Sequence, residues 1–241
     1  MTKVIVTTTI NPPTEALRKF GAMPDWELVV IGDKKTPSDF HIDGAIYVTP
    51  EEQEKYDPGL SWALGWNCVE RRNYGFLWAK DMDADVVAVV DDDNVPLDNW
   101  GDDVWIGREV EVDFYETDKL AFDPSTFPIA SNRIGPFNSQ NTFVSPDWLG
   151  EYFLFPFVGR FIDIWTAYYV QAHGAKLIYG PPTVFQDRNE HDLTRDLAAE
   201  FVGYEHTLEL LGRLEEDPMA IFDFMPERAA VAYRAYRKHF E

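Results

Sequence analysis

The sequence predicts an α/β protein in which helices cover a mostly parallel sheet. Apolar, β-branched segments alternate with segments of helical periodicity through the first half of the chain, as in sheets whose strands are joined by helices. The apolar segments contain few polar positions, which is typical of strands buried on both faces. With 45% hydrophobic residues, the 241-residue chain has enough apolar material for one sizeable core.

The first half of the chain contains the expected sheet. Thr14 belongs to a residue type favoured at helix N-caps, and it precedes a segment with Leu17 and Phe20 on one side. The expected order is strand 3–10, helix 14–23, strand 26–37, strand and helix start 44–56, helix 66–83 and strand 84–93.

The second half is less regular. Residues 97–145 are rich in Asp, Pro, Asn and aromatic residues and are expected to form loops with short strands. A helix is expected over 159–175 and a strand over 176–186, and from about residue 193 the periodicity is helical. We therefore expect a single domain over residues 1–241 with a helical C-terminal extension.

Charge and composition exclude several classes of function. The chain has 21 Lys and Arg against 42 Asp and Glu, and the resulting charge of −21 repels nucleic acid and anionic lipid surfaces. The single cysteine, Cys68, excludes an internal disulfide and a cysteine-built metal site. No apolar run approaches the roughly 20 residues of a membrane span, and the N-terminus lacks the layout of a signal peptide. We expect a cytoplasmic protein.

Three consecutive acids, Asp91, Asp92 and Asp93, follow the expected fourth strand. In open α/β sheets, ligands bind outside the carboxyl ends of the strands. On an extended strand, Asp91 and Asp93 would share one face and Asp92 would point away. Neighbouring carboxylates repel unless a cation lies between them, which predicts a Mn²⁺ or Mg²⁺ site that keeps positions open for substrate phosphates. A solvated acidic turn is the alternative. The chain has no P-loop and no GxGxxG fingerprint.

Several segments resemble known families in the same order along the chain. "VVIGDKKTP", "GAIYVTPEEQ" and "RRNYGFLWAKDMDADVVAVVDDDN" resemble the STELLO-type plant Golgi proteins, which have a similar IG-x-x-KTP turn and an R-x-x-GYL-x-A helix before an Asp-rich strand end. The same helix and "DDDN" also resemble the reversibly glycosylated polypeptides, the UDP-arabinopyranose mutases, as do "NSQNTFV" and "VGRFIDIWTAYYV". Together these stretches cover roughly residues 3–190.

Both resemblances imply the GT-A nucleotide-sugar fold, a Rossmann-like sheet flanked by helices. They imply a UDP-sugar donor whose diphosphate is bridged by Mn²⁺ or Mg²⁺ bound at a DxD-type motif, here Asp91 to Asp93. Asp163 matches the second acid of the GRYDDMW motif of the mutases, whereas the first acid is replaced by Ile162. An acceptor glycan or small molecule is expected, and the long C-terminal helices allow a homo-oligomer.

One departure favours sugar transfer over mutase activity. The mutases have an R-G-Y-P-F-S-L-R-E-G segment whose first arginine becomes glycosylated, and this chain lacks it. Arg133 lies in the corresponding interval, but the second arginine has no counterpart. The leading hypothesis is a metal-dependent glycosyltransferase. A UDP-sugar mutase and a non-catalytic nucleotide-sugar-binding scaffold are the alternatives.

Polar residues at the ends of the first two expected strands are candidate nucleotide contacts. Thr8, Thr9 and Asn11 would hydrogen-bond the uracil or ribose. Asp33 would accept from the uracil N–H or the ribose hydroxyls, and Lys35 would contact the nucleotide. Polar turns after buried strands would have the same composition.

Five further residues are candidates for the site. Arg71 and Arg72 precede the acidic strand end, where a guanidinium would reach the diphosphate or pair with the acids, or would form a surface salt bridge. Asp163 would be the general base for the acceptor hydroxyl, or a favourable charge at a helix N-terminus. His191 would be a third metal ligand or a solvated loop residue. Trp165 would stack on a sugar ring, although aromatic-rich segments are mainly core. Asp91 and Asp92 would also belong to the nucleotide-sugar site.

Overall fold

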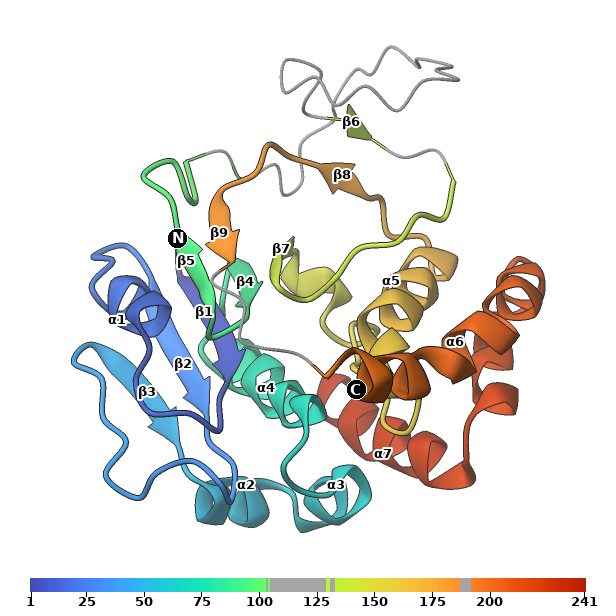
Figure 1. Cartoon of the computed structure of the whole chain (residues 1–241), viewed down its shortest axis with the longest axis horizontal. Helices are drawn as coiled ribbons and strands as arrows, with labels where there is room; N and C mark the ends of the chain where they lie inside the picture. The colour runs from blue at the N-terminus through green and yellow to red at the C-terminus, as the bar shows by residue number, and fades with distance from the viewer. Residues whose placement is uncertain (103, 105–128, 131–132, 187–191) are drawn as a thin grey trace.

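A five-stranded sheet forms the centre of the molecule (Figure 1). The computed structural model describes residues 1–102, 104, 129–130, 133–186 and 192–241. The strands of the sheet are β1 (Lys3–Thr8), β2 (Glu27–Ile31), β3 (Ala45–Val48), β4 (Val86–Val90) and β7 (Asn141–Val144). Their order is β3-β2-β1-β4-β7, and only β7 runs antiparallel to its neighbour. The predicted class is confirmed, because this mostly parallel sheet flanked by helices is consistent with a Rossmann-like GT-A fold.

Alternating side chains along the buried strands divide the core into two layers. Val4 and Val6 of β1 face one layer, which includes Tyr74 and Leu77 of α4 (Asn73–Asp81). Ile5 faces the other layer, with the apolar side of α1 (Glu15–Gly21). The predicted cap of α1 is confirmed, because the Thr14 side chain accepts a hydrogen bond from the Leu17 N–H.

The region between β3 and β4 differs from the prediction of one helix over 66–83. It contains α2 (Pro50–Tyr56), α3 (Pro58–Leu64), η1 (Val69–Arg72) and α4. Thr49 and Asp57 cap the first two helices, each followed by a proline at the first helical position. The chain turns at Gly65 and Asn67, whose φ angles are 81° and 58°. This left-handed backbone prevents a helix from starting at residue 66.

The second half supplies α5 (Ile162–Ala172) and the expected helical extension. That extension consists of α6 (Leu193–Leu214), η5 (Pro218–Phe224), α7 (Glu227–Arg237) and η6 (Lys238–Phe240). The short elements are η3 (Pro146–Trp148), η4 (Gly159–Phe161), β5 (Asn94–Pro96) paired with β9 (Val184–Gln186), and β6 (Ile129–Ala130) paired with β8 (Ile178–Tyr179). Among the described helices, none combines the length and the apolar character that crossing a bilayer requires.

The strand order defines where a ligand is expected. The chain leaves β1 toward β2 and β3 and then returns to the other side of β1 as β4. Such a reversal opens a crevice at the carboxyl ends of the two central strands. β1 and β4 pair in the register Val6↔Val89. If this register is extended by three residues beyond the strands, Thr9 lies next to Asp92.

Candidate functional site

The three acids lie in a tight turn at this crevice. β4 ends at Val90, and the Asn94 N–H donates to the Asp91 carbonyl (3.3 Å) to close the turn. The sequence predicted an extended strand here, with Asp91 and Asp93 on one face and Asp92 on the other. That prediction is wrong. Because the backbone turns here, each of the three carboxylates has different partners.

Asp92 ties the end of β1 to the start of α1. Its Oδ2 accepts hydrogen bonds from the Thr9 hydroxyl and from Asn11 Nδ2, the latter at 2.9 Å. Its carbonyl accepts from the hydroxyl of Thr14, the cap of α1, at 2.5 Å. The structure thus brings Thr9, Asn11 and Asp92 together, with the two side chains on the carboxylate, while their predicted contacts with a nucleotide stay a prediction. Thr8 is different, because its hydroxyl donates to the Ile31 carbonyl of β2 (2.9 Å).

A buried network connects Asp91 to Asp163. Arg72 Nη2 donates to Asp91 Oδ1 (2.5 Å), and Arg72 Nη1 donates to the carbonyl and hydroxyl of Ser139 (3.1 and 2.7 Å). The Ser139 hydroxyl donates to Asp163 Oδ1 (2.6 Å). The side chain of Arg72 is only 2% exposed. Arg72 therefore pairs with the acid cluster as predicted, and it does so inside the protein rather than as a surface salt bridge.

The electrostatics of this network favour proton transfer at Asp163. Burial raises the pKa of Asp163, while the Ser139 hydrogen bond and the Arg72 charge act in the opposite direction. Burial also disfavours the charged form of Arg72, but the Asp91 and Asp163 charges outweigh it and raise the pKa of the guanidinium. A carboxylate with a raised pKa is a stronger base than an exposed one, so Asp163 has the character that a general base requires.

Asp93 fits a bound cation. Its Oδ1 is buried and meets no hydrogen-bond donor among the described residues, and only Gln186 Nε2 approaches Oδ2 (3.4 Å). Burial and the neighbouring Asp91 charge raise the pKa of Asp93. No group of three or more His, Cys, Asp and Glu side chains is arranged as a metal site within the described ranges. Mg²⁺ is commonly bound by one or two carboxylates together with substrate phosphates. Asp91 and Asp93 therefore fit an ion that arrives with a diphosphate.

The end of β2 forms a second polar corner of the crevice. The buried Asp33 carboxylate accepts hydrogen bonds from the backbone N–H groups of Lys34 (2.6 Å) and Cys68 (3.1 Å). These bonds hold η1 against β2, so Asp33 has a structural task in addition to any nucleotide contact. Lys35 is exposed on the same turn, and the Lys34 ammonium lies 4.5 Å from the centre of the Trp66 ring.

Two predicted site residues lie in the interior instead. The Arg71 guanidinium is buried, donates to Gln53 Oε1 (2.8 Å) and Ser61, and stacks on Trp66 at 3.7 Å. It joins α2 and α3 to η1, so a diphosphate contact by Arg71 is not supported. Trp165 is fully buried and its Nε1 donates to Thr207 (3.0 Å), so neither ring face is open to a sugar. His191 lies outside the described residues.

Sequence reasoning missed Glu70 and Ser139. Ser139 connects Arg72 and Asp163. It lies in the segment "NSQNTFV" that carries part of the resemblance, but the sequence did not single out its hydroxyl. Glu70 is 8% exposed, and its pKa is raised by burial and by the Asp163 charge. An acid next to two arginines suggests a local ion pair, and only the tertiary structure shows that Glu70 is buried.

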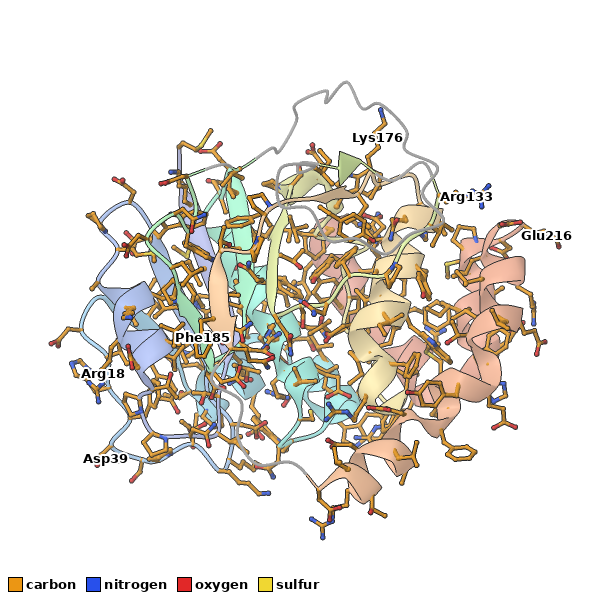
Figure 2. All side chains as sticks on the ribbon, turned by 45° about the horizontal axis from the view of Figure 1, so that its top comes forward. Arg18, Asp39, Arg133, Lys176, Phe185 and Glu216 are labelled. Carbon is orange, nitrogen blue, oxygen red and sulfur yellow. The ribbon has the colours of Figure 1, made fainter. Side chains whose placement is uncertain are left out.

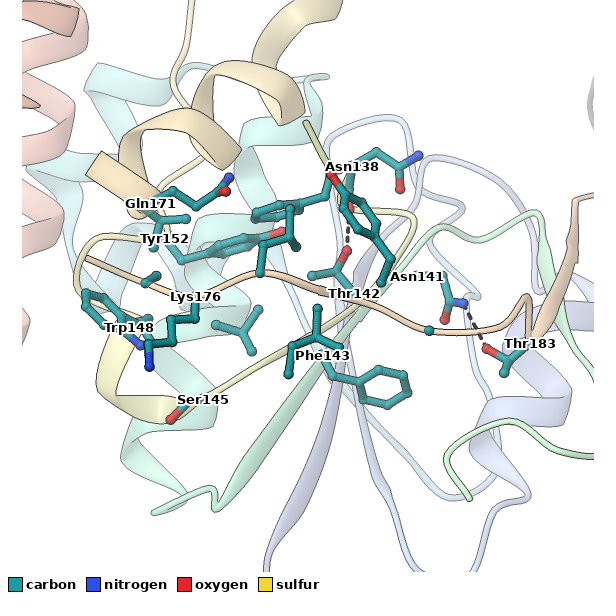
Figure 3. A pocket seen from close by; sticks show the side chains of 18 of the residues that line it. Asn138, Asn141, Thr142, Phe143, Ser145, Trp148, Tyr152, Gln171, Lys176 and Thr183 are labelled. Carbon is teal, nitrogen blue, oxygen red and sulfur yellow. Dashed lines mark hydrogen bonds between the residues drawn. The ribbon is translucent and has the colours of Figure 1, made fainter. Parts of the chain in front are cut away.

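A cavity of about 860 Å³ lies beside β7 (Figure 3). Its walls include Phe143, Trp148, Tyr152, Gln171, Lys176 and Thr183. None of the predicted site residues that the structure describes lines it. Two of its lining residues adjoin the buried network, because Asn138 precedes Ser139 and Tyr152 lies within the electrostatic influence of Asp163 and Arg72.

Comparison with known proteins relates the chain to glycosyltransferases. No protein-family model matches it. Over 116 residues, or 48% of this chain, it is 27% identical to the Arabidopsis thaliana protein named Probable glycosyltransferase STELLO2. The match spans 14% of that protein, so the chain corresponds to a small part of its length. This similarity supports the resemblance to STELLO-type proteins, whereas the resemblance to the mutases stays a prediction.

Proposed function

We propose that the protein is a metal-dependent glycosyltransferase that transfers a sugar from a UDP-sugar to a hydroxyl group of an acceptor. The observation that carries the proposal is the acid turn at the β1/β4 crevice, where a buried Asp93 oxygen meets no donor among the described residues and Arg72 connects Asp91 to Asp163. The similarity to a probable glycosyltransferase supports the same reaction class.

Each residue has a defined task in this reaction. Asp91 and Asp93 would hold Mn²⁺ or Mg²⁺, which neutralises the charge that develops on the departing UDP. Thr9, Asn11 and Asp92 fix the end of β1 where the nucleoside would lie. Arg72 holds Asp91 in place and, through Ser139, orients Asp163.

Asp163 would take the proton from the acceptor hydroxyl. The acceptor oxygen then forms a bond to the anomeric carbon, the bond from that carbon to the UDP oxygen breaks, and UDP leaves with the bonding electrons. Burial raises the pKa of Asp163, which makes its carboxylate a stronger base toward the acceptor hydroxyl. A base in this role fits inversion at the anomeric carbon.

The test measures UDP release from a panel of UDP-sugars with Mn²⁺. Asp93→Ala is expected to abolish metal-dependent turnover, whereas Asp98→Ala, which removes an exposed acid of the same region, leaves it unchanged. Asp163→Asn is expected to lower turnover by about 10²–10⁴-fold, the range typical of a general base. It should still bind UDP and Mn²⁺, seen as an increase in melting temperature. Mn²⁺-dependent activity in Asp93→Ala would contradict the proposal.

The same assay separates the two alternatives. A mutase would convert UDP-arabinopyranose to the furanose form without net release of UDP. A scaffold would bind UDP with Mn²⁺ and show no turnover with any donor.

A further inference from the structure

The long helix α6 exposes an apolar stripe. Its members are Leu193, Leu197, Phe201, Tyr204 and Leu208, which are 79%, 53%, 63%, 64% and 85% exposed. Their spacing of three and four residues places them on one side of the helix, along roughly 22 Å of its axis at 1.5 Å per residue. Large apolar patches of this kind on a folded protein mark interaction sites.

The opposite side of α6 already has partners within the molecule. Gly203, Leu210 and Leu214 are buried against the rest of the chain. A methyl group on Gly203 would lie 2.0 Å from Cγ of Phe161, so η4 packs directly on the helix there. Of the stripe, Tyr204 also touches Phe161, with ring centres 5.3 Å apart, but all five side chains of the stripe stay more than half exposed.

Acidic residues border the stripe. On one border, Arg160 pairs with both Asp196 and Glu200 through bonds of 3.1 and 3.2 Å, so these three side chains together keep a net negative charge. On the other border, Glu205 and Glu209 are exposed, and within the described part of the chain the ion pairs of these two acids are limited to the contact of Glu205 with His206 at 3.8 Å. Among the described residues, this border therefore keeps its negative charge, in a chain of net charge −21.

These charges decide among three kinds of occupant. An anionic membrane is disfavoured, because helices that lie on such surfaces have Lys and Arg beside the apolar face. A second copy is disfavoured, because an antiparallel pairing would bring Glu205 and Glu209 against the same two acids. A parallel pairing would bring them against the border of Asp196 and Glu200. Like charges flanking a helix pair oppose association.

We infer that the α6 stripe is a docking surface for an amphipathic helix of another protein or segment, with an apolar seam and Lys or Arg on its flanks. The apolar seam would cover Leu197, Phe201, Tyr204 and Leu208, and its cations would pair with Glu205 and Glu209. Two amphipathic helices that pair along such stripes contact each other through apolar residues spaced by three and four positions. This inference is independent of the proposed enzymatic activity.

The test uses two labelled helical peptides of three heptads with Leu at the seam, one with Lys and the other with Glu at the flanking positions. Fluorescence anisotropy with the full chain is expected to show binding of the Lys peptide only. Phe201→Ser should weaken that binding about tenfold, a loss of about 1.4 kcal/mol. The control Phe185→Ser changes a side chain that is 62% exposed on β9, away from α6 (Figure 2), and should leave the affinity unchanged.

A charge reversal provides the second arm. The double substitution Glu205→Lys and Glu209→Lys should transfer the preference from the Lys peptide to the Glu peptide. Equal binding of the two peptides would overturn the inference by showing apolar association without charge recognition. Equal loss from Phe201→Ser and Phe185→Ser would overturn it by showing that binding does not depend on the α6 stripe. A dimer in sedimentation equilibrium that Phe201→Ser dissolves would overturn it in favour of a second copy.

Discussion

Replacing Arg72 by Met tests whether the buried network holds the site together. The substitution keeps an unbranched apolar stem of similar volume but removes the guanidinium and its bonds to Asp91 and Ser139. Removing one partner of a buried ion pair costs about 3–5 kcal/mol, because the other charge stays buried. Since the Asp91 side chain is 26% exposed and can be partly solvated, we expect a loss near the lower end, about 3 kcal/mol.

The loss in free energy of unfolding caused by Arg72→Met should become smaller as the pH falls. Burial raises the pKa of Asp163, and Arg72 opposes that rise. Without Arg72, the pKa of Asp163 in the folded protein lies further above its unfolded value. Between the unfolded and the folded pKa, the unfolded chain has released a proton that the folded protein retains. The destabilisation caused by Arg72→Met is therefore largest above the folded pKa of Asp163. It shrinks as the pH falls through that value toward the ordinary aspartate pKa of about 3.9.

Urea unfolding of both forms at neutral and at mildly acidic pH measures the effect. The matched control is Arg160→Met, whose side chain is 38% exposed and binds Asp196 and Glu200 at the surface. Surface pairs of this kind contribute below about 1 kcal/mol. If Arg72→Met costs no more than Arg160→Met, or if its cost grows on acidification, the reasoning about the network is wrong.

Two further predictions concern positions where the structure assigns packing. Gly75→Ala should lower the free energy of unfolding by about 1–3 kcal/mol, because the new methyl group would lie 2.2 Å from Val6 Cγ1 and would push α4 away from β1. Gly212→Ala, with nothing within 4 Å, should instead raise it by about 0.5–1 kcal/mol through helix propensity, and equal effects in urea unfolding would refute the packing argument. Trp165→Phe should cost about 2 kcal/mol, through a smaller ring and a lost bond to Thr207, without changing KM for the donor. A raised KM with unchanged stability would restore Trp165 to the sugar site.

Local sequence patterns determined the sheet, its first helix and the helical extension. The β-branched runs at β1, β2 and β4 are buried on both faces, and Thr14 caps α1, because these features depend on residues within a few positions. The same logic located the acids at a strand end, since strand ends follow directly from where an apolar run stops. The prediction of one helix over 66–83 was wrong because a turn at Gly65 and Asn67 interrupts its start.

Only the tertiary structure decided which polar residues meet. Arg71 and Arg72 are adjacent in sequence, yet the first binds Gln53 and Ser61 and the second binds Asp91 and Ser139. The partners of Arg71 lie on α2 and α3, whereas Arg72 bonds Ser139, 67 residues further along the chain. The Arg72–Asp91 pair depends on the strand order that returns β4 to the side of β1. Sequence periodicity reports which side of an element is apolar. The partner of a buried charge is selected by packing between distant elements, where desolvation makes an unpaired charge costly.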